Sequence, residues 1–284
     1  MASSRTRRLA ATALLALALA ALGGVAWRDT TRPTLGEVTV SVPGLTREVT
    51  VLHVSDLHGE SFGEEQALIA DLLGETQFDV IVVNGDLVAS FEADPAPALA
   101  LLDVLDRHSE TILFSRGNHD PDAFVAEVTS RGITSLLEAS AATTIAPDAG
   151  TVLATTPSHA QTVAPADCLV LVSHDPMTAA DIASQDSLPA PTRLYLFGHT
   201  HGGQVRLPFI GAIWAPEPCP LAAHTHTLSG GLFPDLRGYY VRGLYRTPDG
   251  AYVHVSPGLG THRVHLRLFN RAEVTMVHLV PAEV

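Results

Sequence analysis

The chain has 284 residues, of which 46% are hydrophobic, and it carries a formal net charge of −13 without a single lysine. An acidic chain with no basic runs is not expected to bind nucleic acid nonspecifically. Its two cysteines, Cys168 and Cys219, are too few for a disulfide scaffold and are not spaced as a metal-binding pair. The length suits one large domain with its own core.

The first 27 residues are predicted to be a signal anchor or a cleaved signal peptide. Arg5, Arg7 and Arg8 precede an uncharged run over residues 9–27, which is close to the ~20 residues needed to span a bilayer. Arginines on the amino side predict that the rest of the chain lies outside the cytoplasm. Small residues at 24–26 leave cleavage open, and in that case the protein would be secreted.

Residues 28–48 are predicted to be a linker followed by an edge strand, because Val38, Val40 and Val42 alternate with polar residues. Residues 49–284 then form the predicted domain. Helices are predicted over residues 64–73, 97–105 and 123–130, and helix-compatible sequence runs to residue 187. Strands are predicted over residues 51–54, 80–83, 111–114, 134–137, 151–155, 168–172 and 194–197, and β-like segments over 239–245, 252–255, 264–269 and 274–279. Apolar strands that alternate with helices favour an α/β fold with a largely parallel, buried sheet.

Five of these strands end in side chains that can bind a metal ion. These side chains are Asp56 and His58, Asp86, Asn118 and His119, His174, and His199 and His201. Ligands collect at the carboxyl ends of strands in α/β sheets, so we expect these residues to converge. Carboxylate, imidazole and amide groups without a thiolate indicate Mn, Fe, Zn or Ni. The ligands are too many for one ion, and Asp86, alone on its strand, is the natural bridge between two.

In this order the motifs Asp-x-His, Gly-Asp, Gly-Asn-His-Asp, His and Gly-His-x-His resemble those of the calcineurin-like metallophosphoesterases, from about residue 49 to the C-terminus. The resemblance implies a four-layer sandwich of two mixed β-sheets flanked by helices. It implies that one metal is held by Asp56, His58 and His201, the other by Asn118, His174 and His199, with Asp86 as the bridge. It makes His119 the catalytic histidine and Asp120 the residue that orients it. One departure is Ala89, where many members have an aspartate that is not a ligand.

The resemblance implies hydrolysis of a phosphodiester or pyrophosphate bond by a metal-bound hydroxide. His119 would stabilise the transferring phosphoryl group or protonate the leaving oxygen. We expect a monomer that acts on a phosphorylated small molecule or a lipid-linked substrate at the extracytoplasmic membrane face. Residues 198–208 and 258–261 further resemble a membrane-associated bacterial branch, some of whose members cleave the pyrophosphate of UDP-2,3-diacylglucosamine. Kinship of this kind transfers chemistry better than substrate.

Two alternatives stay open beside this interpretation. A phosphomonoesterase would use the same ligands, and a metal-binding surface protein without activity would keep them but lose His119 or Asp120, which are both present. A β-lactamase-like zinc hydrolase is excluded because glycines follow His201 where that class needs His-x-His-x-Asp-His. The remaining histidines are interpreted as structural: His53, His108, His159, His254, His262, His265 and His278, together with the His224/His226 pair in a proline-rich loop.

The segment 207–237 is predicted to form a wall that selects the substrate. It follows the His199/His201 strand end directly, and it is long and rich in proline. It carries Phe209, Trp214, Phe233 and other apolar residues among few charges, which would suit a lipid-bearing substrate or a membrane surface. The alternative is that these residues pack onto the domain.

Overall fold

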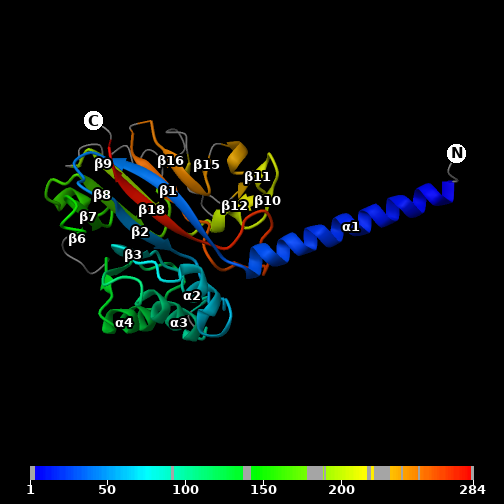
Figure 1. Ribbon diagram of the computed structural model, residues 1–284, viewed down its shortest axis with the longest axis horizontal. Coiled ribbons are helices and arrows are strands. Elements are labelled where there is room, and N and C mark those ends of the chain that lie inside the picture. Colours follow the sequence, from blue (N-terminus) through cyan, green and yellow to red (C-terminus); the bar gives the residue numbers. More distant parts are fainter. Residues whose placement is uncertain are drawn as a thin grey trace.

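The computed structural model describes residues 4–90, 93–136, 142–177, 188, 190–215, 219–220, 231–237, 239–248 and 250–282. Two six-stranded mixed sheets form its body (Figure 1). The first sheet has the order β1 (Thr34–Val42), β18 (Glu273–Pro281), β2 (Val49–Val54), β3 (Val80–Val83), β4 (Ile112–Phe114) and β5 (Thr134–Ser135). The second has the order β16 (Gly243–Arg246), β17 (Tyr252–Val255), β9 (Thr192–Phe197), β8 (Cys168–Ser173), β7 (Val152–Thr155) and β6 (Thr143–Ile145).

Parallel pairing dominates both sheets, as the sequence predicts. In the first sheet only β18 and β2 pair antiparallel. In the second sheet only the two outer pairs, β16–β17 and β6–β7, are antiparallel. The predicted edge strand is β1, which lies at one edge of the first sheet. The predicted architecture of two mixed sheets flanked by helices is therefore confirmed.

The two sheets pack against each other through one apolar layer, because alternate side chains of each strand point to opposite faces. From β3, Val80 and Val82 enter this inner layer, while Ile81 and Val83 point the other way. From β8, Val170 and Val172 enter it from the opposite sheet. Strands buried on both faces are apolar at successive positions, which accounts for the continuous apolar runs in the sequence.

Three helices cover the outer face of the first sheet: α2 (Ala67–Leu73), α3 (Ala96–Leu105) and α4 (Asp122–Ser130) (Figure 1). The helix predicted from residue 64 is interrupted, because Glu65 and Gln66 have left-handed backbones and only a 3₁₀ turn, Glu64–Gln66, precedes α2. The buried Gln66 amide explains the break, since it accepts from Phe62 N and donates to the carbonyls of Glu60 and Pro97.

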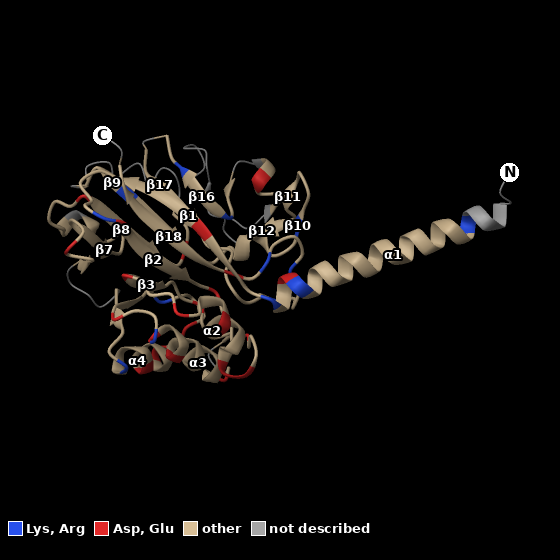
Figure 2. Ribbon diagram, in the orientation of Figure 1, with Lys and Arg blue, Asp and Glu red and all other residues tan. Residues whose placement is uncertain are grey.

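Helix α1 (Ser4–Thr31) projects away from the domain (Figure 1) and is long and apolar enough to cross a membrane or to act as a signal sequence. Figure 2 shows that its charged residues lie near its two ends. The helix continues through Arg28–Thr31, where a linker was expected. Its end is fixed to the domain, since Thr30 Oγ1 accepts from Arg267 N at 2.8 Å and Asp29 O accepts from Ala272 N at 2.9 Å.

Short ribbons and turns complete the described chain. The ribbons pair β10 (Arg206–Leu207) with β11 (Gly211–Ala212), β12 (Trp214–Ala215) with β14 (Gly231–Leu232), and β13 (Cys219–Pro220) with β15 (Tyr239–Tyr240). Further 3₁₀ turns span Ala160–Thr162, His201–Gly203 and Asp235–Arg237. The predicted segment 239–245 is two strands, β15 and β16, rather than one. The helix-compatible residues 178–187 and the His224/His226 pair lie outside the described residues.

The strand predicted over residues 264–269 is wrong, because this segment forms a loop with a single bridge between Val205 and Leu268. Arg263 and Phe269 at its ends have φ angles of 62° and 52°, which a strand does not allow. Between them the Arg267 side chain is fully buried and binds backbone carbonyls of other loops. Its apolar alternation reflects packing around this arginine rather than strand pairing.

Candidate metal centre

The predicted ligands, which come from five separate loops, lie together at the carboxyl ends of the central strands. The side-chain donor atoms of Asp56, His58 and His201 lie within 4.8 Å of one another, and those of Asp86, His174 and His199 do the same. Asn118, the seventh predicted ligand, has its Oδ1 3.1 Å from Nδ1 of His199. The two groups correspond to the two ligand sets that the resemblance implies.

Asp86 lies between the two groups. Its Oδ2 is 3.4 Å from Nε2 of His58 and 3.1 Å from Nε2 of His174, so one carboxylate reaches a histidine of each group. Asp56 approaches the other members, with its Oδ1 3.6 Å from Nε2 of His201 and 4.0 Å from Nε2 of His174. The position of Asp86 therefore suits a ligand that bridges two ions.

Backbone carbonyls orient two of the buried histidine rings of the centre. His174 Nδ1 lies 2.7 Å from Asn84 O, and His201 Nδ1 lies 3.4 Å from Gly260 O. A ring that donates its Nδ1 proton to a carbonyl presents the Nε2 lone pair on its other side. In both residues Nε2 faces the aspartates, which is the arrangement that a metal ligand requires.

Burial and charge set the protonation of these rings. Burial lowers the pKa of His58 to about 3 and lowers the pKa of His201 well below its ordinary value, so both are neutral at pH 7 and can bind a metal. Burial also opposes protonation of His174, but its close contact with Asp86, and the charges of Asp86 and Asp56, raise its pKa to about 10. A metal that binds here must displace the His174 proton.

The donor set fits divalent metal ions. Within the described part of the chain, the buried Nε2 atoms of His58 and His174 make no well-aligned hydrogen bond, although both lie among carboxylate oxygens. Buried polar atoms without hydrogen-bond partners are rare in folded proteins and point to an ion or water that completes them. Imidazole nitrogen and carboxylate oxygen suit borderline divalent metals.

Left-handed backbone conformations recur at these ligands. The φ angles of Asp56, His58, Asp86, His199 and His201 all lie between 49° and 65°. Such angles are uncommon in residues other than glycine and cluster at functional sites. Gly117 is needed beside them, because a Cβ there would lie 2.2 Å from Asp86 Oδ1.

His119 stands at the rim of the centre, partly exposed. Its backbone N–H donates to Asp86 Oδ1 at 2.7 Å, and its Nδ1 lies 3.0 Å from Ala89 O. Its ring meets that of His58 edge-on, with centroids 4.9 Å apart. The backbone of Ala89, rather than a side chain at that position, orients His119.

Asp120 differs from its predicted role of orienting His119. Both of its carboxylate oxygens accept backbone N–H groups, from Asp86, Gly117, Leu87 and Val88, at 2.8 to 3.3 Å. It is fully buried, and burial raises its pKa despite these bonds. Asp120 therefore fastens the Asp86 loop to the Gly117 turn, and it is a positioning residue.

His262 was interpreted as structural, but the structure places it at the centre. Its ring lies 5.6 Å from that of His58 and 5.4 Å from that of His119, and the three rings form a further group of donor atoms. No predicted strand ends at His262. The signal that was available is the glycine block 258–260 just before it, since Gly258 packs against Asp56 and a Cβ there would lie 2.7 Å from Asp56 Cβ.

Arg267 and Asn270 hold the glycine block and the His201 turn together, and the sequence reasoning missed both. Arg267 donates to Gly260 O and Pro257 O at 2.5 to 3.0 Å, and burial lowers its pKa to about 10. Asn270 Nδ2 donates to His201 O at 2.7 Å. The loop that looked like a strand thus supports one of the candidate ligands.

Comparison with known proteins agrees with this geometry. The sequence model of a family described as calcineurin-like phosphoesterase matches residues 49–203, which include all seven predicted ligands and His119. The chain is also 31% identical over 110 residues to "Uncharacterized metallophosphoesterase YkuE" of Bacillus subtilis (strain 168). That match covers 39% of this chain and only 30% of the relative. The narrower resemblance to UDP-diacylglucosamine pyrophosphatases stays a prediction.

Proposed function

The chain belongs to the calcineurin-like phosphoesterase family. We propose that it is a metal-dependent phosphoesterase that hydrolyses phosphodiester or pyrophosphate bonds with two divalent ions at the extracytoplasmic face of a membrane. The observation that carries the proposal is the pair of donor groups joined by Asp86. A single carboxylate between two groups of buried imidazoles is the arrangement expected of a dinuclear site.

In this proposal Asp56, His58 and His201 hold one ion, and Asn118, His174 and His199 hold the other. Mn, Fe, Zn and Ni all suit these donors. When bound, the ions would activate water and draw charge from the phosphoryl oxygens. Two aspartates carry about −2 against about +4 from two divalent ions, so the occupied centre would attract an anionic phosphate despite the acidity of the chain.

His119 is proposed as the acid that protonates the leaving oxygen or stabilises the phosphoryl group. Its Nδ1 is engaged by Ala89 O, which leaves Nε2 to face the substrate. His262 lies beside it and provides a second imidazole on the same side of the centre. Both rings are partly exposed, unlike His58 and His201, so a substrate phosphate can reach them.

The membrane location is proposed from α1. An 18-residue window of this helix is apolar and has none of its residues buried in the domain. The uncharged stretch lies between Arg8 and Arg28, with Arg5 and Arg7 also on its amino side, which favours an orientation with the domain outside the cytoplasm. Because Asp29 and Thr30 are buried in the domain, the membrane would lie within a few residues of the first sheet.

Two substitutions test the assignment in the full chain purified in detergent and loaded with Mn, Zn or Ni. Asp86→Asn should reduce bound metal as well as activity, because the carboxylate serves both groups. His119→Ala should keep near-normal metal and lose about 10²–10⁴-fold in rate, the range for a missing acid–base group. His278→Ala, on β18 and paired with Glu48, is the matched control and should change neither quantity.

Metal content is read by mass spectrometry and rates on a panel of phosphate monoesters, diesters and pyrophosphates. Loss of both ions from the His119 variant would contradict its role. Faster cleavage of monoesters than of diesters and pyrophosphates would contradict the proposed bond preference and indicate a phosphomonoesterase. A fully loaded protein that cleaves no ester of the panel would refute the catalytic proposal.

A further inference from the structure

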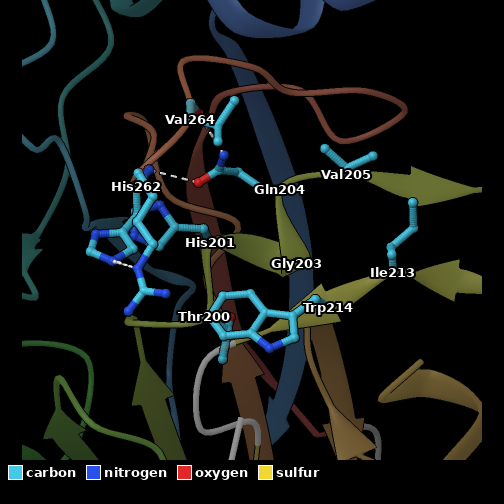
Figure 3. A pocket seen from close by; sticks show the side chains of 10 residues that line it. Thr200, His201, Gly203, Gln204, Val205, Ile213, Trp214, His262 and Val264 are labelled. Atoms are coloured by element: carbon cyan, nitrogen blue, oxygen red, sulfur yellow. Dashed lines mark hydrogen bonds between the residues drawn. The ribbon is translucent and has the colours of Figure 1, made fainter. Parts of the chain in front are cut away.

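We propose that an apolar pocket beside the metal centre binds an aliphatic group of the phosphoester substrate. The inference rests on the proposed function and names the class of substrate that the site would take. The pocket has a volume of about 370 Å³, in the range of small-molecule sites. Its lining includes His201, His262, Val205, Ile213, Trp214 and Val264 (Figure 3).

The pocket opens onto the metal centre. His201 and His262 belong both to the groups of metal-binding donors and to the lining of the pocket. Figure 3 shows these two histidines on one side of the pocket, with Val205 and Ile213 on the other. A molecule that fills this space therefore touches the centre, so we assign the pocket to the substrate rather than to a separate ligand.

Away from the two histidines and Arg263, the walls of the pocket offer hydrocarbon rather than free hydrogen-bonding groups. The Gln204 amide is used within the protein, since Nε2 donates to the carbonyls of Val264 and Leu266 and Oε1 accepts from His262 N. The Thr200 hydroxyl donates to Val241 O. With these polar groups engaged, a polar ligand would lose hydrogen bonds to water without replacement, whereas an aliphatic chain would gain by leaving water.

Apolar side chains that line the pocket are partly exposed to solvent. Trp214 is 39% exposed and Val264 is 61% exposed, although the nearby candidate ligands Asp56, His58 and His201 are buried. Arg263 lies with its guanidinium 5.8 Å from the Trp214 ring and its Nε 3.1 Å from His262 Nε2. A cation between the histidines and the apolar wall fits a ligand whose anionic phosphate is bonded directly to a hydrocarbon chain.

The floor of the pocket is rigid. A Cβ on Gly203 would lie 2.2 Å from Ala212 Cβ, so β11 packs directly on the turn that carries His201. The apolar wall and the candidate ligand are therefore parts of one close-packed unit. Because their spacing is fixed, the pocket should favour chains that begin at the phosphate and extend a few methylenes from it.

The test uses p-nitrophenyl alkyl phosphates with methyl, butyl and octyl chains and the Mn-loaded full chain in phosphatidylcholine nanodiscs. Each methylene buried is expected to raise kcat/KM up to about fourfold, so butyl should exceed methyl by roughly tenfold or more. Val264→Trp, which fills the pocket from an exposed position, should remove this preference while methyl is still cleaved. Val264→Ser should weaken it. Bound metal should stay unchanged in both variants.

Phe209→Ser is the matched control, because Phe209 is fully exposed and lines a different hollow, with Leu236 and Phe269. It should leave the chain-length preference intact. Equal kcat/KM values for the methyl and butyl esters in the wild type would overturn the pocket proposal but leave the proposed phosphoesterase activity standing. Loss of the chain-length preference in Phe209→Ser would overturn the pocket, because the preference would then come from contact with the bilayer. Cleavage of none of the esters would overturn the proposed function and this inference with it.

Binding without turnover gives an independent readout. By calorimetry, butylphosphonate should bind the Mn-loaded protein roughly tenfold more tightly than methylphosphonate, with a more negative heat-capacity change. Val264→Trp should abolish the difference. Equal affinities of the two phosphonates in the wild type would contradict an aliphatic pocket.

Discussion

Replacing His254 by asparagine should make the free energy of unfolding less sensitive to acid. His254 on β17 and His53 on β2 are fully buried and join the two sheets, with their Nδ1 atoms 3.0 Å apart. Burial, with a smaller contribution from the charge of Arg242, lowers the pKa of His254 to about 4. Burial likewise lowers the pKa of His53 well below its ordinary value.

The sign of the pH dependence follows from which state, folded or unfolded, binds the proton of His254. Histidine in the unfolded chain takes up a proton below about pH 6.5, whereas folded His254 stays neutral until about pH 4. Between these values the unfolded state binds more protons, so the free energy of unfolding falls as the pH falls. The loss approaches about 1.4 kcal/mol per pH unit between the two pKa values, and it amounts to roughly 2 kcal/mol from pH 6.5 to pH 4.5 for this residue.

Asparagine suits the substitution because its Oδ1 can stand in for Nδ1. Asn84 Nδ2 lies 3.2 Å from His53 Nε2, so we infer that His53 carries its proton on Nδ1 and that position 254 accepts it. Asparagine accepts the same bond and does not titrate. The variant should be less stable at pH 6.5 because it packs less volume, but its unfolding free energy should depend less steeply on pH.

The assay is urea unfolding of the full chain in detergent at pH 6.5, 5.5 and 4.5, with metal removed. Contributions of buried histidines that do not contact residue 254 are common to both proteins and cancel in the difference between the two slopes. His159→Asn, in a loop outside the two sheets, is the control and should keep the wild-type slope. Parallel pH dependences for wild type and His254→Asn would refute the reasoning.

Three further predictions concern the centre and the anchor. Gly117→Ala should weaken metal binding roughly 10–100-fold, because its Cβ would displace Asp86; Gly23→Ala, on α1 where a Cβ meets open space, should leave metal content normal. Arg267→Met removes the hydrogen bonds that the buried arginine donates to three backbone carbonyls and should lower the free energy of unfolding by about 3 kcal/mol; an unchanged free energy of unfolding in urea would contradict this. A reporter fused after Val284 should be active only outside the cytoplasm, and cytoplasmic activity would reverse the proposed topology.

Much of the fold could be predicted because its strands carry a local signal. A strand buried on both faces is apolar at every position, as in β3 and β8, and such runs stand out in any sequence. The convergence of the candidate ligands could be predicted because they follow such runs closely. Asp56, Asp86 and His199 are each placed by the strand before them, so order along the chain was enough to place them at one edge of the fold.

Other features depend on contacts between distant segments and left no local signal. Residues 264–269 alternate like a strand, but the buried Arg267 binds loop carbonyls and holds them out of both sheets. His262 reaches the centre only because this loop folds back over it. The role of Asp120 likewise depends on the N–H groups of a loop that lies more than 30 residues earlier.

Hydrogen bonds between the ligand loops explain how so many left-handed residues are held at one place. Each such residue carries strain of about 1–3 kcal/mol unless its surroundings fix it. The β2 loop donates from Asp56 N to Gly85 O and from His58 N to Asp86 O, both at 2.9 Å. Asp56 in turn accepts from His199 N at 3.0 Å.

Asp120 adds bonds to the Asp86 loop, so the strained backbones support one another. Electrostatic repulsion between Asp56 and Asp86 is reduced by the proton on His174, which lies near both carboxylates. The backbone of the centre is therefore expected to keep its shape when the metal is removed. Metal binding should then exchange a proton for a cation within a preformed site, rather than order the loops that form it.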